Sequence, residues 1–90
     1  MQTCAVAKTA ELLSDPWTML IIRDLIRNNL RFCELERALD GISTRTLTIK
    51  LKTLEEQGII QKMDHGYVIT KTGKKLQGII DAMEDFGKKL

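Results

Sequence analysis

The segment over residues 32–54 constrains the fold most strongly, because it holds two helical patterns on either side of a tight turn. In each pattern an apolar residue recurs every three or four positions, which is the spacing of one helix face. The two stripes are Phe32, Leu35 and Leu39, followed by Leu47, Leu51 and Leu54. Gly41 can adopt the positive φ that ends a helix, and Ser43 can cap the next one. The segment therefore predicts a helix-turn-helix.

Further elements flank this segment on both sides. Asp15 and Pro16 are typical of a helix start, and Asn28 can end that helix in the left-handed conformation. His65-Gly66 is expected to form a tight turn between two short strands. The expected elements are helices over residues 4–13 (with Thr3 as N-cap), 16–28 and 44–57, strands over 59–64 and 67–70, and a final helix over 72–90.

This order of elements predicts a mainly α fold with a small β-hairpin, which is the arrangement of a winged helix-turn-helix. It would have a three-helix core, a short wing and extra helices at both termini. Residues 1–90 are expected to form a single domain, because no repeat, linker or low-complexity tract divides them. Since so short a chain buries only a small core, we expect it to gain stability as a homodimer.

Cysteine usage and hydrophobic patterning favour a cytoplasmic protein. Cys4 and Cys33 form neither a disulfide framework nor a metal-binding spacing. The N-terminus lacks the pattern of a signal peptide, and the apolar cluster over residues 19–22 is too short to cross a membrane. No nucleophile–base pair, paired-carboxylate motif or phosphate loop is visible, so we expect no enzyme activity, catalytic residue, cofactor or metal.

The charge distribution indicates where a nucleic acid would bind, although the net charge of +2 is too small to do so alone. Residues 41–54 contain Arg45, Lys50 and Lys52 but no Asp or Glu. Helical spacing turns Arg45, Thr48, Ile49 and Lys52 away from the leucine stripe. A helix with such a face fits the major groove of double-stranded DNA. The candidate DNA-binding residues are Arg31, Ser43, Thr44, Arg45, Thr48, Ile49, Lys50, Lys52 and Lys62.

These candidates differ in the contact each can make. Arg45 can donate two hydrogen bonds to guanine, and the hydroxyls of Thr44 and Thr48 can reach bases or phosphates. Ile49 is either a contact to a thymine methyl group or a tolerated surface residue. The remaining basic residues, Arg31, Lys50, Lys52 and Lys62, are either phosphate contacts or solvated surface charges.

Several motifs, in order, resemble the HxlR-type transcriptional regulators, whose fold is MarR-like. They are Cys4-Ala5-Val6-Ala7, residues 16–25 (PWTMLIIRDL), residues 31–35 (RFCEL), residues 41–47 (GISTRTL) and residues 54–60 (LEEQGII). The resemblance implies a winged helix-turn-helix homodimer that regulates transcription, with a recognition helix starting at Ser43. It also implies a dimer interface formed by the first and last helices. The interface candidates are Val6, Leu76, Ile80, Met83, Phe86 and Leu90.

The chain departs from the family pattern at two places. Its hairpin, residues 63–67, is shorter than the usual wing and lacks the usual arginine and proline, which makes minor-groove reading by the wing doubtful. Cys33 replaces a residue that is often Gly or Asn, and we interpret it as a packing residue. His65, the only histidine, is interpreted as a turn residue.

Two questions about function stay open in the sequence. A cysteine at the place of Cys4 senses oxidants or electrophiles in several family members, but a small buried residue at the dimer interface explains Cys4 as well. The favoured function is regulation through a pseudo-palindromic operator, with a small-molecule or oxidant effector as a further partner. The alternative is a winged-helix module that binds another protein without sequence-specific DNA binding.

Overall fold

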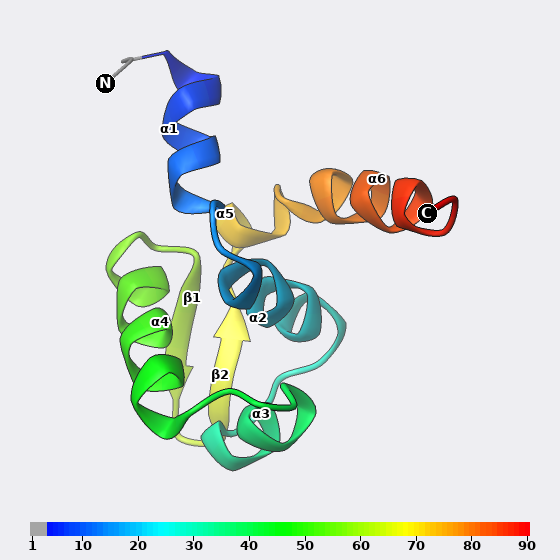
Figure 1. The fold of residues 1–90 in the computed structure, drawn as a ribbon. Coiled ribbons are helices and arrows are strands. Elements are labelled where there is room, and N and C mark those ends of the chain that lie inside the picture. The colour runs from blue at the N-terminus through cyan, green and yellow to red at the C-terminus, as the bar shows by residue number, and fades with distance from the viewer. Residues whose placement is uncertain (1–3) are drawn as a thin grey trace.

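The computed structural model describes residues 4–90, and its elements follow the predicted order. They are α1 (Ala5–Leu12), α2 (Pro16–Arg27), α3 (Phe32–Ala38), α4 (Thr44–Glu56), β1 (Ile60–Met63), β2 (Gly66–Ile69), α5 (Lys71–Lys74) and α6 (Gln77–Gly87). In Figure 1, α2, α3, α4 and the hairpin form one body, from which α1 and α6 project. The predicted winged helix-turn-helix, mainly helical with one antiparallel hairpin, is confirmed.

The core lies between α2, α3, α4 and the hairpin. The leucines of both apolar stripes in the helix-turn-helix segment are buried in this core, whereas Phe32, the first residue of the first stripe, is only partly buried. By contrast, α1 and α6 contain no fully buried residue. The buried core residues are Ile21, Ile22, Leu25, Leu35, Leu39, Ile42, Leu47, Leu51, Leu54, Ile59 and Ile60. Among the described residues, no helix has the length and apolar character needed to span a bilayer.

Local capping signals fix the starts of α2 and α4 as predicted. Asp15 accepts a hydrogen bond from the Thr18 amide at 2.9 Å, and Ser43 accepts one from the Thr46 amide at 3.0 Å. Gly41 has a φ of 91°, so it makes the turn between α3 and α4 in the conformation expected of it. At α1, Cys4 occupies the N-cap position. Thr3, which the sequence suggested for that role, lies outside the described residues.

The hairpin turns one residue earlier than predicted. Met63 pairs with Gly66, so the two turn residues are Asp64 and His65 rather than His65 and Gly66. Gly66 instead lies against the segment before α3, where an added Cβ would meet the Leu30 carbonyl oxygen at 2.6 Å. With a φ of 124° as well, this position requires glycine, because a side chain would push the wing away from α3.

The single final helix predicted over residues 72–90 is wrong, because the structure has two helices there. Gly73 is buried, and an added Cβ would lie 2.7 Å from Ile69 Cδ1 and closer still to the Ile59 carbonyl oxygen. The short helix α5 is thus packed against the hairpin. The Leu76 amide then bonds to the Gly73 carbonyl at 3.0 Å, three residues back, and the chain bends into α6. Helix α2 ends at Arg27, next to the predicted stop at Asn28-Asn29, but Asn28 is extended with a φ of −151° rather than left-handed.

Candidate nucleic-acid interface

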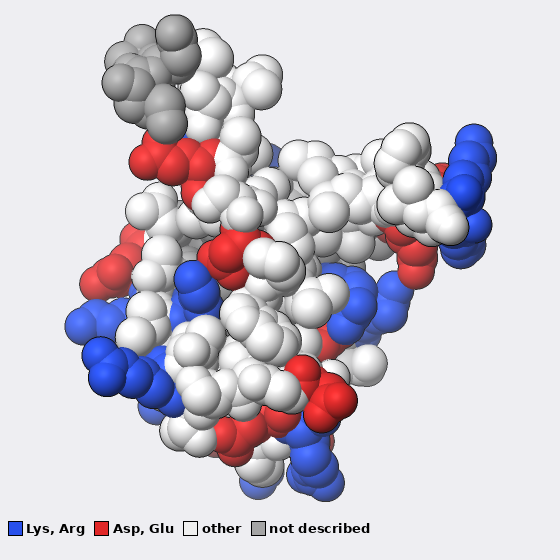
Figure 2. Space-filling view, in the orientation of Figure 1, with Lys and Arg blue, Asp and Glu red and all other residues white. Residues whose placement is uncertain are grey.

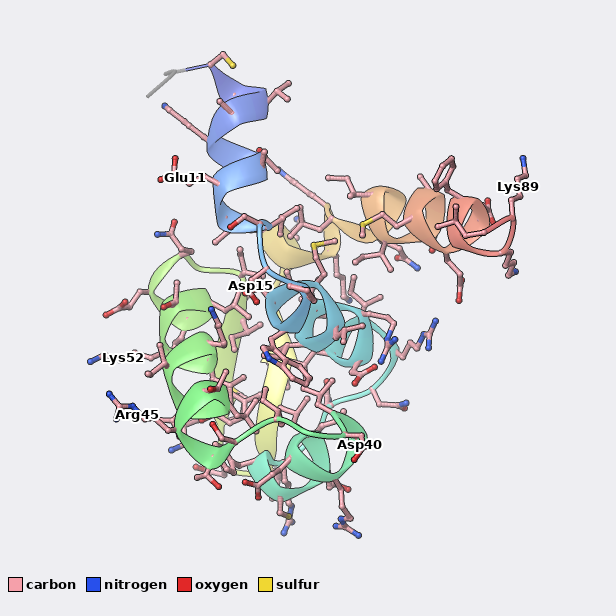
Figure 3. The ribbon with its side chains drawn as sticks, viewed as in Figure 1. Glu11, Asp15, Asp40, Arg45, Lys52 and Lys89 are labelled. Carbon is pink, nitrogen blue, oxygen red and sulfur yellow. The ribbon has the colours of Figure 1, made fainter. Side chains whose placement is uncertain are left out.

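Helix α4 has one buried face and one face open to solvent, as its sequence predicts. Leu47, Leu51 and Leu54 anchor the inner face in the core. Arg45 and Lys52 extend from the outer face on the same side of the helix (Figure 3), and basic side chains gather over α4 in Figure 2. The exposed residues of this face are Arg45, Thr48, Ile49 and Lys52. The face therefore offers hydrogen-bond donors and one apolar side chain to a partner.

The first turn of α4 contains an acidic neighbour that the sequence pattern did not reveal. Thr44 Oγ1 donates a hydrogen bond to Oε2 of Glu36, a residue of α3. The turn over residues 39–43 brings the last turn of α3 beside the first turn of α4. The Thr48 hydroxyl is also engaged, because it donates to the Thr44 carbonyl at 2.8 Å. Residues 41–54 contain no acidic residue, but Glu36 of α3 places a carboxylate beside the first turn of α4.

Lys50 does not extend freely from α4 as the other basic candidates do. Its Nζ lies 2.8 Å from Oδ2 of Asp15, and both side chains are about two-thirds buried, with 29% and 32% exposed. Asp15 also accepts hydrogen bonds from the amide and the hydroxyl of Thr18, each at 2.9 Å. The ammonium group of Lys50 thus connects α4 to the start of α2. Because it is paired with Asp15, it is less available to contact a phosphate than the other basic candidates.

Partial burial raises the pKa of Asp15, but the hydrogen bonds from Lys50 and Thr18 and the positive charge of Lys50 outweigh this effect. The pKa of the Asp15 carboxyl consequently lies below its usual value. Because its pKa is lowered, the Asp15 carboxylate keeps its charge at neutral pH, where its contact with Lys50 joins α2 to α4.

Arg31 and Lys62 do not lie on α4, since Arg31 directly precedes α3 and Lys62 belongs to strand β1 of the wing. The backbones of Leu30 and Tyr67 exchange two hydrogen bonds, of 3.2 Å and 2.7 Å, which join the segment before α3 to β2. Lys62 pairs with Tyr67 from the other side, across the hairpin. Arg31 and Lys62 are both exposed, so each presents a basic side chain on the surface around the wing. Asp64 at the wing tip adds a negative charge to it.

The projecting helices α1 and α6 carry exposed apolar side chains. Val6 is 79% exposed, Met83 51% and Phe86 66%, and Leu90, three residues beyond α6, is 91% exposed. The surface from α1 across to α6 is largely uncharged in the view of Figure 2. Of the other interface candidates, Leu76 and Ile80 pack partly against the core of their own chain. Ile79, which is not among the predicted interface residues, is 40% exposed and lines an open apolar groove with α1.

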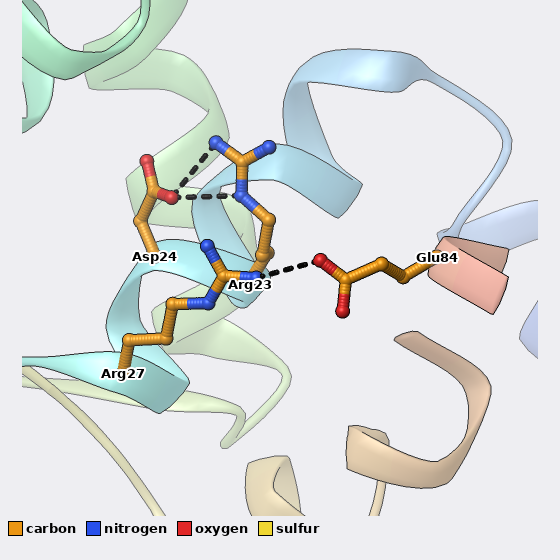
Figure 4. Close-up of polar contacts among 4 residues, drawn as sticks. All are labelled: Arg23, Asp24, Arg27 and Glu84. Atoms are coloured by element: carbon orange, nitrogen blue, oxygen red, sulfur yellow. Dashed lines mark hydrogen bonds and ion pairs between the residues drawn. The ribbon is translucent and has the colours of Figure 1, made fainter. Parts of the chain in front are cut away.

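A polar contact at the edge of a small pocket ties α6 to the body. Arg27 of α2 donates to Glu84 of α6 at 3.2 Å, while the neighbouring Arg23 donates to Asp24 within α2 (Figure 4). The pocket is lined by these arginines and by apolar side chains from both helices. The apolar residues are Met19 and Leu20 of α2 and Ile80 and Met83 of α6. Contacts from Ile80 to Glu84 therefore hold α6 on α2, while only its C-terminal end projects.

Both cysteines are exposed. Cys4 Sγ accepts a hydrogen bond from the Ala7 amide at 3.4 Å at the start of α1. The packing role predicted for Cys33 is wrong, because its side chain lies on the solvent side of α3. His65 occupies the hairpin turn, as interpreted from the sequence. Within the described residues, no group of three or more His, Cys, Asp or Glu side chains could hold a metal ion.

Comparison with known proteins identifies the family. The model of the HxlR-like helix-turn-helix family matches residues 12–90. An HTH-type transcriptional regulator from Synechocystis sp. is 33% identical over 91 residues, which cover 93% of this chain and 67% of the relative. The crystal structure of a MarR-family transcriptional regulator from Porphyromonas gingivalis W83 has a TM-score of 0.90 and 35% identity, with 98% of this chain and 93% of that chain covered.

A further solved structure, quinone-bound YodB from B. subtilis, has a TM-score of 0.86 and 28% identity, with 94% of this chain and 97% of that chain covered. The similarity in fold thus spans almost the whole chain, including the projecting helices. The chain belongs to the HxlR-like helix-turn-helix family, whose members are transcriptional regulators and not enzymes.

Proposed function

We propose that the chain binds double-stranded DNA sequence-specifically, as a homodimer with α4 in the major groove. The observation that carries this proposal is the two-sided character of α4. Its inner leucines are buried, whereas its outer face presents Arg45 and Lys52 on the same side. A helix held in this way can enter the groove without disturbing the core, and side chains near its N-terminal end reach the base edges.

The side chains of the outer face have distinct roles in this proposal. Arg45 reads guanine through two hydrogen bonds, a contact worth about 1–3 kcal/mol of discrimination. Ile49 meets a thymine methyl group, and Lys52 holds a phosphate. Arg31 and Lys62 hold phosphates beside the wing. Lys50 contributes less than these, since its ammonium is paired with Asp15.

The projecting helices support the proposed homodimer. We propose that α1 and α6 of two copies cover each other, because their exposed apolar side chains are otherwise left in water. Two copies related by a two-fold axis read a pseudo-palindromic operator, whose half-sites are about 10 base pairs, or a multiple of that, apart.

An effector can act on the same region. Cys4 is exposed at the start of α1, beside the proposed interface, and the similar YodB structure holds a quinone. We propose that an oxidant or electrophile acts at Cys4 and changes DNA affinity through α1.

The DNA proposal is tested by selecting bound sequences from a random pool and then titrating the selected site over a series of salt concentrations. We expect affinity to fall steeply with salt, because phosphate contacts release counterions. Arg45→Ala should relax the base preference at one position, whereas Lys52→Ala should weaken binding to all sequences alike. Lys89→Ala, on the far end of the molecule (Figure 3), is the charge-matched control and should leave affinity within about twofold.

The same experiment distinguishes the alternative function. If the dimer enriches no sequence and its weak DNA binding does not depend on Arg45, the chain is a protein-binding winged helix instead. Equal loss on every sequence for Arg45→Ala would refute its base-reading role alone.

A further inference from the structure

The first turn of α4 contains a hydroxyl whose proton is already committed. Thr44 Oγ1 donates to Oε2 of Glu36, which lies eight residues earlier on α3. A threonine hydroxyl has one proton and two acceptor lone pairs, whereas carboxylate oxygens only accept. The direction of this hydrogen bond is therefore fixed. Thr44 is itself exposed, so the lone pairs that remain on its oxygen are what it offers to a partner.

This polarity restricts what Thr44 can bind in a major groove. Phosphate oxygens, guanine O6 and N7, and thymine O4 are all acceptors, so none can donate to Thr44. The donors in the groove are the exocyclic amino groups, N4 of cytosine and N6 of adenine. The Glu36 carboxylate strengthens this selection, because it attracts an amino group and repels a phosphate. Together the two side chains form a patch that only accepts hydrogen bonds.

We propose that Glu36 is a specificity-determining positioning residue. By holding the Thr44 proton, it makes the start of α4 favour an amino-bearing base, cytosine or adenine, over a keto base, guanine or thymine, at one position of a DNA strand. The inference rests on the proposed insertion of α4 into the major groove. It is complementary to Arg45, whose guanidinium only donates and so reads guanine at a different position.

A purely structural role for Glu36 makes a different prediction. A carboxylate beside the N-terminus of α4 stabilises that helix through its dipole, whatever sequence is bound. Loss of the charge would then change stability, or affinity for all DNA, but would leave the base preference unchanged. Base preference is therefore the measurement that separates the two roles.

The test is selection of bound sequences from a random double-stranded pool by the full chain and four variants. For wild type we expect one position in each half-site at which cytosine or adenine exceeds guanine or thymine by roughly fivefold or more. Glu36→Ala frees the hydroxyl to donate, so the preference at that position should disappear or move toward keto bases. Thr44→Val removes the hydroxyl and should abolish the preference, whereas Thr44→Ser retains the hydroxyl and should retain the preference.

Asp40→Asn is the matched control, because it removes one exposed carboxylate from the same helix-turn-helix without changing the Thr44 contact. It should strengthen binding to all DNA slightly and leave every base preference as in wild type. Thermal melts followed by circular dichroism establish that each variant is folded. Thr44→Val gives an independent answer even if Glu36→Ala destabilises the chain.

The outcomes that overturn the inference are distinct from failure of the proposed function. Sequence enrichment with identical base preferences in wild type, Glu36→Ala and Thr44→Val would overturn the role of Glu36 and leave DNA reading by α4 intact. The role of Glu36 would also be overturned, with DNA reading by α4 intact, if no position in the selected sequences distinguishes amino-bearing from keto bases. A wild-type protein that enriches no sequence would overturn both proposals.

Discussion

Asp15 has two structural tasks at once, since it caps α2 and pairs with Lys50 of α4. The cap was predictable from the local sequence, because a cap and its partner are three residues apart. The pair was not, because its members are 35 residues apart and meet only after α2 and α4 pack. The contact between Glu36 and Thr44 was missed for the same reason. Helical periodicity predicts which face a residue occupies, but not which side chain of another helix lies opposite.

The Asp15–Lys50 pair leads to a prediction about acid stability. The pKa of Asp15 is lower in the folded chain than in the unfolded chain, where it is about 3.8. The pair therefore stabilises the fold fully above that value, and its contribution is lost as pH falls through the folded pKa. Asp15→Asn retains the cap and should cost at most about 1 kcal/mol at pH 7, because the pair is partly solvated. It should also reduce the loss of stability between neutral pH and about pH 3.

The measurement is urea denaturation at fixed protein concentration and several pH values. Asp15→Ala removes the cap as well and should cost about 1–2 kcal/mol in total at pH 7. Asp64→Asn, at the exposed wing tip, controls for loss of a carboxyl group and should retain the acid dependence of wild type. An Asp15→Asn variant that loses as much stability in acid as wild type would contradict the role of the pair.

Cys4 is exposed at the start of α1, where an oxidant or electrophile can reach its thiol. We expect a quinone or a mild oxidant to weaken binding of wild type to its selected DNA site several-fold, because a modified thiol alters the start of α1. Cys4→Ser should bind DNA as wild type does and should not respond, since serine is itself a good N-cap. Cys33→Ser is the matched control, because Cys33 is also exposed and its loss should leave the response unchanged. The measurement is the DNA affinity of wild type and both variants before and after treatment with the quinone or oxidant. An equal loss of affinity in Cys4→Ser and wild type would exclude Cys4 as the sensor.

At the scale of elements, α4 was the most predictable part of the chain and the final helix the least. Local residues mark both ends of α4, because Ser43 caps its start and Gly58, with a positive φ, follows its end. Its three leucines define one face. The break between α5 and α6 has no such local signal, because the sequence from 72 to 90 fits one amphipathic helix. It depends on Gly73 lying under the hairpin, a tertiary contact that periodicity does not reveal.

Two glycines of this region are predicted to respond oppositely to alanine. Gly73→Ala places a Cβ against the Ile59 carbonyl and the Ile69 side chain, so it should cost about 1–3 kcal/mol through overpacking. Gly78→Ala meets nothing within 4 Å inside α6 and should stabilise the chain by about 0.4–1 kcal/mol, because alanine restricts the unfolded chain. Urea denaturation of both variants tests the packing of α5. A Gly73→Ala variant as stable as Gly78→Ala would show that α5 is not packed tightly against the hairpin.

For the molecule as a whole, the distribution of burial separates two functions in space. The body that contains α4 has a complete core, whereas α1 and α6 expose apolar side chains away from it. The family resemblance of the sequence implied this division, because it placed a dimer interface on the first and last helices, outside the three-helix core. It did not predict that Leu76 and Ile80 would pack partly on their own core, which leaves Ile79 and the C-terminal end of α6 as the exposed apolar surface that we propose for dimerisation.

Phe86 provides the test of that surface, because it is a large aromatic side chain that is 66% exposed on the outer half of α6. Wild type should sediment as a dimer at micromolar concentration. Phe86→Glu should weaken dimerisation by about 2 kcal/mol or more, as expected for a buried aromatic anchor of an interface. It should also lower affinity for a two-half-site operator far more than for a single half-site. The matched control is Ile49→Glu, which alters an apolar side chain, 50% exposed, on α4 instead. Ile49→Glu should remain a dimer and lose DNA affinity. Assembly through α6 would be contradicted if wild type sediments as a monomer. It would also be contradicted if Phe86→Glu dimerises as tightly as wild type.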